Sequence, residues 1–204
     1  MVSAAFDPAV PSRARRPSSA KIVVGGGFGA GKTTFVGAVS EIEPLTTEAV
    51  LTEASRRVDD LSRVPGKRTT TVAMDFGRVT LEGDLMLYLF GTPGQARFWF
   101  MWDDLVRGAV GAVVLVDTRR LEDAFPVVDY FEDSGVPFLV AVNGWNGEFP
   151  YLPEDIRDAL TLREEVPILN VDARDRASAK ATLIAVAEHA IRLRAAETAR
   201  GGQR

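Results

Sequence analysis

Hydrophobic residues along the chain alternate between short continuous runs and longer stretches with helical spacing. The short runs are rich in valine, isoleucine and leucine, which is typical of strands covered on both faces of a sheet. The longer stretches repeat apolar residues every three or four positions and predict amphipathic helices. The predicted strands span residues 21–24, 72–81, 84–90, 109–117, 137–143 and 167–171, and the predicted helices span residues 32–41, 95–107, 119–134, 153–165 and 175–198.

Strands and helices alternate through most of this pattern, which predicts a parallel sheet with helices on both faces. Only Glu82 and Gly83 separate the second predicted strand from the third. So short a link joins antiparallel strands, because a parallel pair needs a long crossover. We therefore expect an α/β fold of three layers, with a mostly parallel six-stranded sheet and one antiparallel edge strand.

The regular pattern occupies residues 21–199 and indicates a single domain. Residues 1–20 contain three arginines, three prolines and several serines, with no hydrophobic period. This composition is typical of a disordered arm. Residues 200–204 are expected to form a short frayed tail.

Composition excludes several classes of function. The 24 basic and 28 acidic residues give a net charge of −4, which argues against nucleic acid as a partner. The chain has no cysteine and a single histidine, so thiolate zinc sites, cysteine nucleophiles and lipid attachment to cysteine are excluded. No apolar run approaches the length of about 20 residues that spans a membrane. We expect a cytoplasmic protein without a membrane anchor of its own, which reaches a membrane through partners.

A glycine-rich segment follows the first predicted strand and fits the pattern G-x-x-x-x-G-K-[ST] between a strand and a helix. Bare backbone amides approach phosphate oxygens closely, and the N-terminus of the next helix adds partial positive charge. Lys32 is expected to reach the β and γ phosphates, and the Thr33 hydroxyl to bind Mg²⁺. The alternative is a glycine-rich turn that binds nothing. The predicted phosphate-binding residues are Gly26, Gly27, Phe28, Gly29, Ala30, Gly31, Lys32, Thr33 and Thr34.

The segment after the third predicted strand carries candidate sensors of the γ phosphate. Gly94 fits a glycine whose N–H contacts that phosphate, and Gln95 fits a glutamine that orients the attacking water. Gly91 stands where GTPases usually carry an aspartate and has no carboxylate to offer. Asp75, on the neighbouring strand of the predicted hairpin, is the candidate to supply it for Mg²⁺. The alternative for Asp75 is a carboxylate at the sheet rim without a metal role.

A run of threonines precedes the second predicted strand. A loop that responds to Mg²⁺ and the γ phosphate needs one threonine, and Thr71 is our candidate, with Thr70 as the second choice. The alternative is a threonine run that only begins a strand. Arg68 is either an arginine supplied to the reaction in cis or a solvated loop residue.

Residues 143–146 read Asn-Gly-Trp-Asn, where guanine-specific proteins carry N-K-x-D. Asn143 suits the role of joining the base pocket to the phosphate loop. Gly144 replaces the lysine of N-K-x-D, whose aliphatic side chain covers the base, and Trp145 is a candidate to stack on the base in its place. Asn146 offers one acceptor and one donor where an aspartate accepts twice from guanine. A donor of Asn146 that faces a donor of guanine weakens binding by about 1–3 kcal/mol. A base other than guanine is therefore an open alternative, with guanine favoured. The predicted base-pocket residues are Asn143, Asn146, Asp172, Ala173 and Arg174, with the Ala173 N–H facing the base oxygen.

Residues 98–102 are five large apolar residues in a row, and one helix cannot turn them all inward. A partner surface that changes with nucleotide state is the favoured interpretation, and plain core packing is its rival. The last predicted helix is expected to pack against the sheet, with His189 at its surface or boundary.

These residues together resemble those of a bacterial Ras-like small GTPase, and more narrowly the small GTPases of actinobacterial conservons, which are similar to MglA-like polarity GTPases. The resemblance implies a P-loop NTPase fold that binds GTP and GDP with Mg²⁺ and hydrolyses GTP slowly. It also implies a roadblock-type protein and a sensor-kinase-like membrane protein as partners, with a GTPase-activating protein as a further candidate. The segments that carry it are residues 26–33, 69–77, 89–102, 114–130, 140–146 and 172–174.

Three hypotheses for function remain open on the sequence. The first is a switch GTPase, the second a nucleotide-bound scaffold with little or no hydrolysis, and the third an enzyme specific for ATP or another base such as xanthine. In the first, the catalytic residues are Lys32, Thr71 and Gln95, and the metal ligands are Thr33, Thr71 and Asp75.

Overall fold

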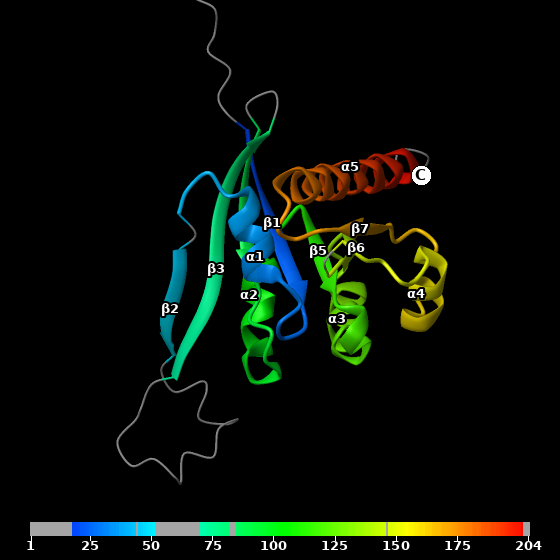
Figure 1. Cartoon of the computed structure of the whole chain (residues 1–204). Coiled ribbons are helices and arrows are strands. Elements are labelled where there is room, and N and C mark those ends of the chain that lie inside the picture. Colours follow the sequence, from blue (N-terminus) through cyan, green and yellow to red (C-terminus); the bar gives the residue numbers. More distant parts are fainter. Residues whose placement is uncertain (1–17, 44, 52–69, 82–84, 146, 202–204) are drawn as a thin grey trace, which may run out of the picture.

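The computed structural model describes residues 18–43, 45–51, 70–81, 85–145 and 147–201, which form one sheet flanked by helices (Figure 1). Within these residues the sheet has seven strands in the order β2-β3-β4-β1-β5-β6-β7. The strands are β1 (Ser18–Gly26), β2 (Leu45–Leu51), β3 (Thr70–Leu81), β4 (Leu85–Gly91), β5 (Gly111–Val116), β6 (Phe138–Asn143) and β7 (Ile168–Val171).

The predicted α/β class and the predicted hairpin are confirmed, and the sheet differs from the prediction at one end. β3 pairs antiparallel with β4, and β2 pairs antiparallel with β3, so β2 and not β3 forms the edge (Figure 1). The 12-residue β3 makes this possible, because residues 70–76 pair with β2 while residues 75–81 pair with β4. The other neighbouring strands are parallel.

The ends of the domain also differ from the prediction. β1 begins at Ser18, where its backbone pairs with Leu85 of β4, so residues 18–20 belong to the sheet and not to the arm. The last helix continues to Gly201. The predicted arm at residues 1–17 and the tail at residues 202–204 lie outside the described residues.

Helices form in all five predicted segments, but two of the predicted long helices are broken, and the one predicted for residues 153–165 ends at Leu160, where Thr161 has a φ of +54°. The segment after β4 is a 3₁₀ turn followed by a short α-helix. The segment after β5 is likewise a 3₁₀ turn followed by an α-helix, with Arg120 outside the helical region and Pro126 in the first turn of the next helix. No helix among the described residues is long and apolar enough to cross a membrane. The helices are α1 (Lys32–Val39), η3 (Ala96–Met101), α2 (Trp102–Val106), η4 (Thr118–Asp123), α3 (Phe125–Ser134), α4 (Pro153–Leu160) and α5 (Arg176–Gly201).

Two hydrophobic clusters hold the helices to the two faces of the sheet. One joins α1 and α5 to the sheet, and the other joins α2, α3 and α4 to the opposite face. Every residue of β5 and β6 is buried, which explains their continuous apolar sequences. The prediction for His189 was wrong: it is 6% exposed on the inner side of α5, and burial lowers its pKa.

Candidate functional site

The glycine-rich segment forms the turn between β1 and α1 at the carboxyl edge of the sheet. Gly31 is the N-cap of α1 with φ of +103°, a backbone conformation that favours glycine. A Cβ at Gly31 would also lie 2.6 Å from Nδ2 of Asn143. The first turn of α1 has neither a side-chain cap nor an acidic residue, so its backbone amides are left to bind an anion.

The Lys32 side chain folds back across this turn. Its Nζ donates to the carbonyl oxygens of Gly26 at 2.9 Å and Gly27 at 2.7 Å, and the residue is 8% exposed. Burial lowers the pKa of the Lys32 ammonium to about 8, partly offset by the negative charge of Asp75. An anion seated at the turn therefore meets a desolvated and already positioned positive charge.

A hydroxyl and a carboxylate meet beside this lysine. The Thr33 hydroxyl donates to Oδ2 of Asp75 at 2.7 Å, and Asp75 is 9% exposed. Asp75 pairs with Gly91 across the β3–β4 ladder. A Cβ at Gly91 would lie 3.0 Å from the Asp75 Cβ and 3.1 Å from its Oδ2, so the Asp75 side chain fills the place of a side chain at position 91. Hard oxygen donors of this kind fit Mg²⁺.

The segment that follows β4 closes the other side of the site. The Thr92 N–H donates to the Val24 carbonyl oxygen at 2.9 Å, which holds the segment beside β1. A Cβ at Gly94 would lie 2.8 Å from Nζ of Lys32 and 3.0 Å from Cα of Phe28, so this glycine rests directly on the turn. The Trp102 indole N–H donates to the Pro93 carbonyl oxygen at 3.3 Å.

These groups surround one cavity of about 470 Å³. Asp75 supplies its carboxylate, Lys32 and Arg97 supply its positive charge, and Gln95 lies exposed at its rim. Among the described residues the lining consists of Phe28, Gly29, Gly31, Lys32, Thr33, Thr34, Asp75, Thr92, Pro93, Gly94, Gln95, Arg97 and Phe98. The structure thus brings together the predicted phosphate-binding residues, Asp75, Gly94 and Gln95. Sequence reasoning missed Arg97, although it follows Gln95 by two positions.

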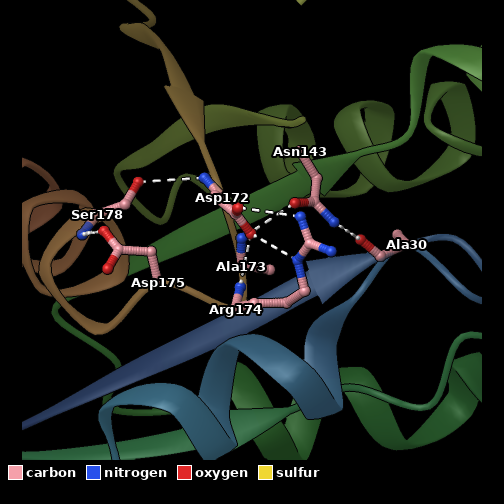
Figure 2. A network of polar contacts seen from close by, with 7 residues as sticks. All are labelled: Ala30, Asn143, Asp172, Ala173, Arg174, Asp175 and Ser178. Atoms are coloured by element: carbon pink, nitrogen blue, oxygen red, sulfur yellow. Dashed lines mark hydrogen bonds and ion pairs between the residues drawn. The ribbon is translucent and has the colours of Figure 1, made fainter. Parts of the chain in front are cut away.

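On the other side of the turn, the buried Asn143 side chain joins three loops (Figure 2). Its Nδ2 donates to the Ala30 carbonyl oxygen at 3.1 Å, and its Oδ1 accepts from the Ala173 N–H at 3.1 Å. The loops after β1, β6 and β7 are therefore held together by one amide, the arrangement predicted for Asn143. Because the Ala173 N–H is engaged by Asn143, this structure does not leave it free to face a base.

Asp172 and Arg174 form an ion pair at the entrance to α5 (Figure 2). The two carboxylate oxygens of Asp172 accept from Nε and Nη2 of Arg174, each at 3.1 Å, and this pairing lowers the pKa of Asp172. Asp175 accepts from the Ser178 N–H at 2.7 Å and caps α5. The ion pair and the cap hold the loop after β7 in one conformation.

Three predicted residues are described only in part or not at all. Thr71 lies in β3, where its backbone pairs with Val50 of β2. It precedes Asp75 by four residues, which is about 13 Å along an extended strand. Its side chain, Asn146 and Arg68 lie outside what the structure describes, so their roles stay predictions.

Comparisons with solved structures identify the fold. The G domain of the FeoB iron transporter of T. maritima matches with a TM-score of 0.56 and 15% identity, and the comparison covers 85% of this chain and 98% of that chain. The FeoB G domain of Methanococcus jannaschii matches with the same TM-score and coverage at 14% identity. At these identities the likeness concerns the fold alone, which is that of a P-loop GTPase domain.

Comparisons of sequence identify the family. The uncharacterized protein MJ1339 of Methanocaldococcus jannaschii is 28% identical over 125 residues, which are 60% of this chain and 68% of that protein. A family model described as conserved hypothetical ATP binding protein matches residues 24–193, from the end of β1 to the last turns of α5. Because this match spans more than four fifths of the sequence, the chain belongs to that family of conserved hypothetical ATP binding proteins.

Proposed function

We propose that the protein is a molecular switch that binds GTP with Mg²⁺ and hydrolyses it slowly to GDP. The observation that carries the proposal is the single cavity in which the phosphate turn, Lys32, the Thr33–Asp75 pair and the Gly94–Gln95 segment meet. Each is the kind of group that phosphoryl transfer from a nucleotide requires. A turn that served only to join β1 to α1 would not need a buried ammonium and a carboxylate beside it.

The Thr33 hydroxyl and the Asp75 carboxylate are the residues that would hold Mg²⁺, with Thr71 as the further candidate from the sequence. The ion would neutralise the negative charge that develops on the phosphate oxygens. A hydroxyl has two lone pairs beside its proton, so the Thr33 hydroxyl would present a lone pair to the ion and keep its hydrogen bond to Asp75. The pairing of Asp75 with Gly91 in the β3–β4 ladder holds the carboxylate beside Thr33.

Gly94 and Gln95 are the proposed sensors of the γ phosphate. Gly94 lines the cavity and lies against the Phe28 backbone and the Lys32 ammonium. A third phosphate placed beside Lys32 would accept from the Gly94 N–H and order the segment, and its loss would release it. Gln95 would then orient the attacking water, since its side chain is exposed at the cavity rim.

Replacing Gln95 by leucine is expected to slow phosphate release by at least tenfold and leave the affinity for GTP within about twofold. Leucine keeps the size of the side chain and removes the amide that orients water. Single-turnover phosphate release measures the first quantity and calorimetry the second. An unchanged rate removes Gln95 from the mechanism, and a wild-type protein that releases no phosphate even with an activating partner is a scaffold.

GTP is the proposed nucleotide because the fold is that of G domains and residues 143–146 resemble the guanine motif. ATP is the second candidate, because the family's description names it. At a ligand concentration of 100 times Kd, binding stabilises the folded state by about 2.7 kcal/mol, which raises the Tm of a domain of this size by roughly 5–10 °C. We expect GTP and GDP with Mg²⁺ to produce this shift and XTP and ATP to produce less; a larger shift with ATP or XTP reassigns the base.

The proposed partners are a roadblock-type protein and a sensor-kinase-like membrane protein, with a GTPase-activating protein as a third. The aromatic run after Gln95 supports a surface for such a partner only in part. Phe98 and Trp102 are buried, whereas Phe100 is 42% exposed at the end of η3. Core packing therefore accounts for at least three of the five residues, because Trp99 also packs against the cluster that joins α2 and α3 to the sheet, and Phe100 is the one that we propose a partner contacts.

A further inference from the structure

A tight turn follows β6 and returns the chain toward the strand it has just left. Trp145 and Glu148 form an isolated antiparallel bridge, and the Glu148 N–H donates to the Trp145 carbonyl oxygen at 3.1 Å. Gly147 has φ of +78°, which such a turn favours in glycine. The turn carries Phe149 back over Gly144, the first residue after the strand.

The ring of Phe149 occupies the space beside Gly144. A Cβ at Gly144 would lie 2.6 Å from Cε1 of Phe149, closer than real Cβ atoms come to a neighbour, and 3.1 Å from its Cε2, so the ring would have to shift. The ring therefore keeps this place only because residue 144 is a glycine. Phe149 is 36% exposed, so part of the ring stays uncovered.

This ring lies where the loops at the carboxyl edge of the sheet converge. Gly144 directly follows Asn143, whose amide joins the phosphate turn at Ala30 to the loop after β7, and the Gly144 N–H donates to Val171 at 2.8 Å. Ligands of open α/β sheets bind outside this edge. Gly26 lies against Leu115 of β5 and Gly25 against Phe131 of α3, so a nucleoside attached to phosphates at the turn would extend toward these loops.

Trp145, the residue that the sequence suggested for stacking, is engaged elsewhere. The Arg119 guanidinium lies 3.8 Å from the centre of the Trp145 ring. Asp117 holds that guanidinium through Nε at 2.9 Å and Nη2 at 2.8 Å, which lowers the pKa of Asp117. One face of the indole is thus covered by a fixed cation, while Phe149 has no such partner among the contacts of the described residues.

We propose that Phe149 is the platform on which the nucleobase stacks, and that Gly144 is required to seat it. This proposal rests on the proposed binding of a nucleoside triphosphate. An aromatic platform favours a nucleoside over a bare polyphosphate and tolerates different bases, because every base has a π face. Phe149 therefore adds affinity for the nucleoside, and discrimination between bases falls to the polar groups around it.

The test compares GTP with inorganic triphosphate, both with Mg²⁺, by calorimetry on the full chain. Phe149→Ala is expected to weaken GTP binding about 5- to 100-fold, the range for loss of one stacked base, and to leave the affinity for inorganic triphosphate unchanged. Tyr151→Ala is the matched control, because Tyr151 is an aromatic residue of the same loop that is 51% exposed. It is expected to leave both affinities unchanged.

Two further variants keep the test decisive if Phe149→Ala folds poorly. Phe149→Tyr retains a ring and is expected to bind GTP like the wild type, whereas Gly144→Ala retains the ring but displaces it and is expected to weaken GTP binding. Equal loss for GTP and triphosphate, no loss in Phe149→Ala, or no loss in Gly144→Ala overturns the proposal for Phe149 and leaves the phosphate site standing. A wild-type protein that binds neither ligand overturns the proposed function itself.

Discussion

Replacing Lys32 by alanine is expected to lower the affinity for GTP by roughly 30- to 3,000-fold, the range for removing one partner of a buried charge pair. The reason is the position of the ammonium, which the Gly26 and Gly27 carbonyl oxygens hold inside the turn before any ligand arrives. Calorimetry with GTP and Mg²⁺ measures the loss. Lys21→Ala is the control, because Lys21 lies on β1 outside the cavity and donates to Arg107. An equal affinity in wild type and Lys32→Ala would remove the phosphate site.

Proton uptake on nucleotide binding is a second measurement that tests the role of Lys32. The pKa of Lys32 is about 8 in the free protein, and phosphates bound beside it favour the charged form and raise that pKa. Binding near pH 8.5 is therefore expected to take up a proton, and the affinity to fall as pH rises above 8. The phosphates of the nucleotide are already deprotonated at this pH. Calorimetry in buffers of different ionisation enthalpy measures the uptake, which Lys32→Ala should abolish.

The second large expected effect is on the affinity for GTP with Mg²⁺ when the carboxylate at position 75 is removed and then supplied again from position 91. Asp75→Ala is expected to weaken binding of GTP with Mg²⁺ by about 10- to 100-fold, the usual cost of losing a group that supports a metal. Adding Gly91→Asp to that variant is expected to restore at least tenfold, because the Cβ of residue 91 points at the space that Asp75 vacates. Titrations with Mg²⁺ and with EDTA measure the dependence on the ion.

Two controls separate this exchange from a loss of stability. Gly91→Asp alone adds a second carboxylate whose Cβ lies 3.1 Å from Oδ2 of Asp75, and it is expected to lower the Tm, since the space is tight and like charges repel. Asp129→Ala removes an exposed carboxylate from α3 and is expected to change neither binding nor Tm. A double variant that binds no better than Asp75→Ala shows that the carboxylate serves the fold and not the metal.

The parts of the fold that the sequence predicted depend on local signals. The strand before Gly26, the turn and α1 follow from a continuous apolar run, closely spaced glycines and a helical period. The strand β2 was missed because Leu45–Leu51 carries three polar residues and little hydrophobic contrast, so its pairing with the first half of β3 is decided by a neighbour distant in sequence. The burial of His189 was missed for the same reason, because the face of α5 that meets the sheet depends on packing.

The candidate site divides in a similar way. Lys32, Thr33, Gly94 and Gln95 were predicted from motifs, because chemistry fixes their spacing. Asp75 was identified only through its place on the neighbouring strand of the hairpin, and the structure adds the contact with Thr33. For Phe149 the sequence offers only the glycine at position 147, which permits the turn that places the Phe149 ring beside Gly144. The contact itself joins positions five residues apart and could not be deduced from spacing.

The indole of Trp102 connects the segment after β4, which lines the cavity, to helix α3. Its N–H holds Pro93, and its ring packs on Tyr130 at 4.9 Å and on Phe131 at 6.0 Å, both in α3. In the proposed switch, a shift of the neighbouring Gly94 makes Pro93 either release the indole or pull it against α3. The proposed GTP-bound and GDP-bound forms are therefore expected to differ in the tilt of α3, a difference that a partner can recognise without approaching the nucleotide.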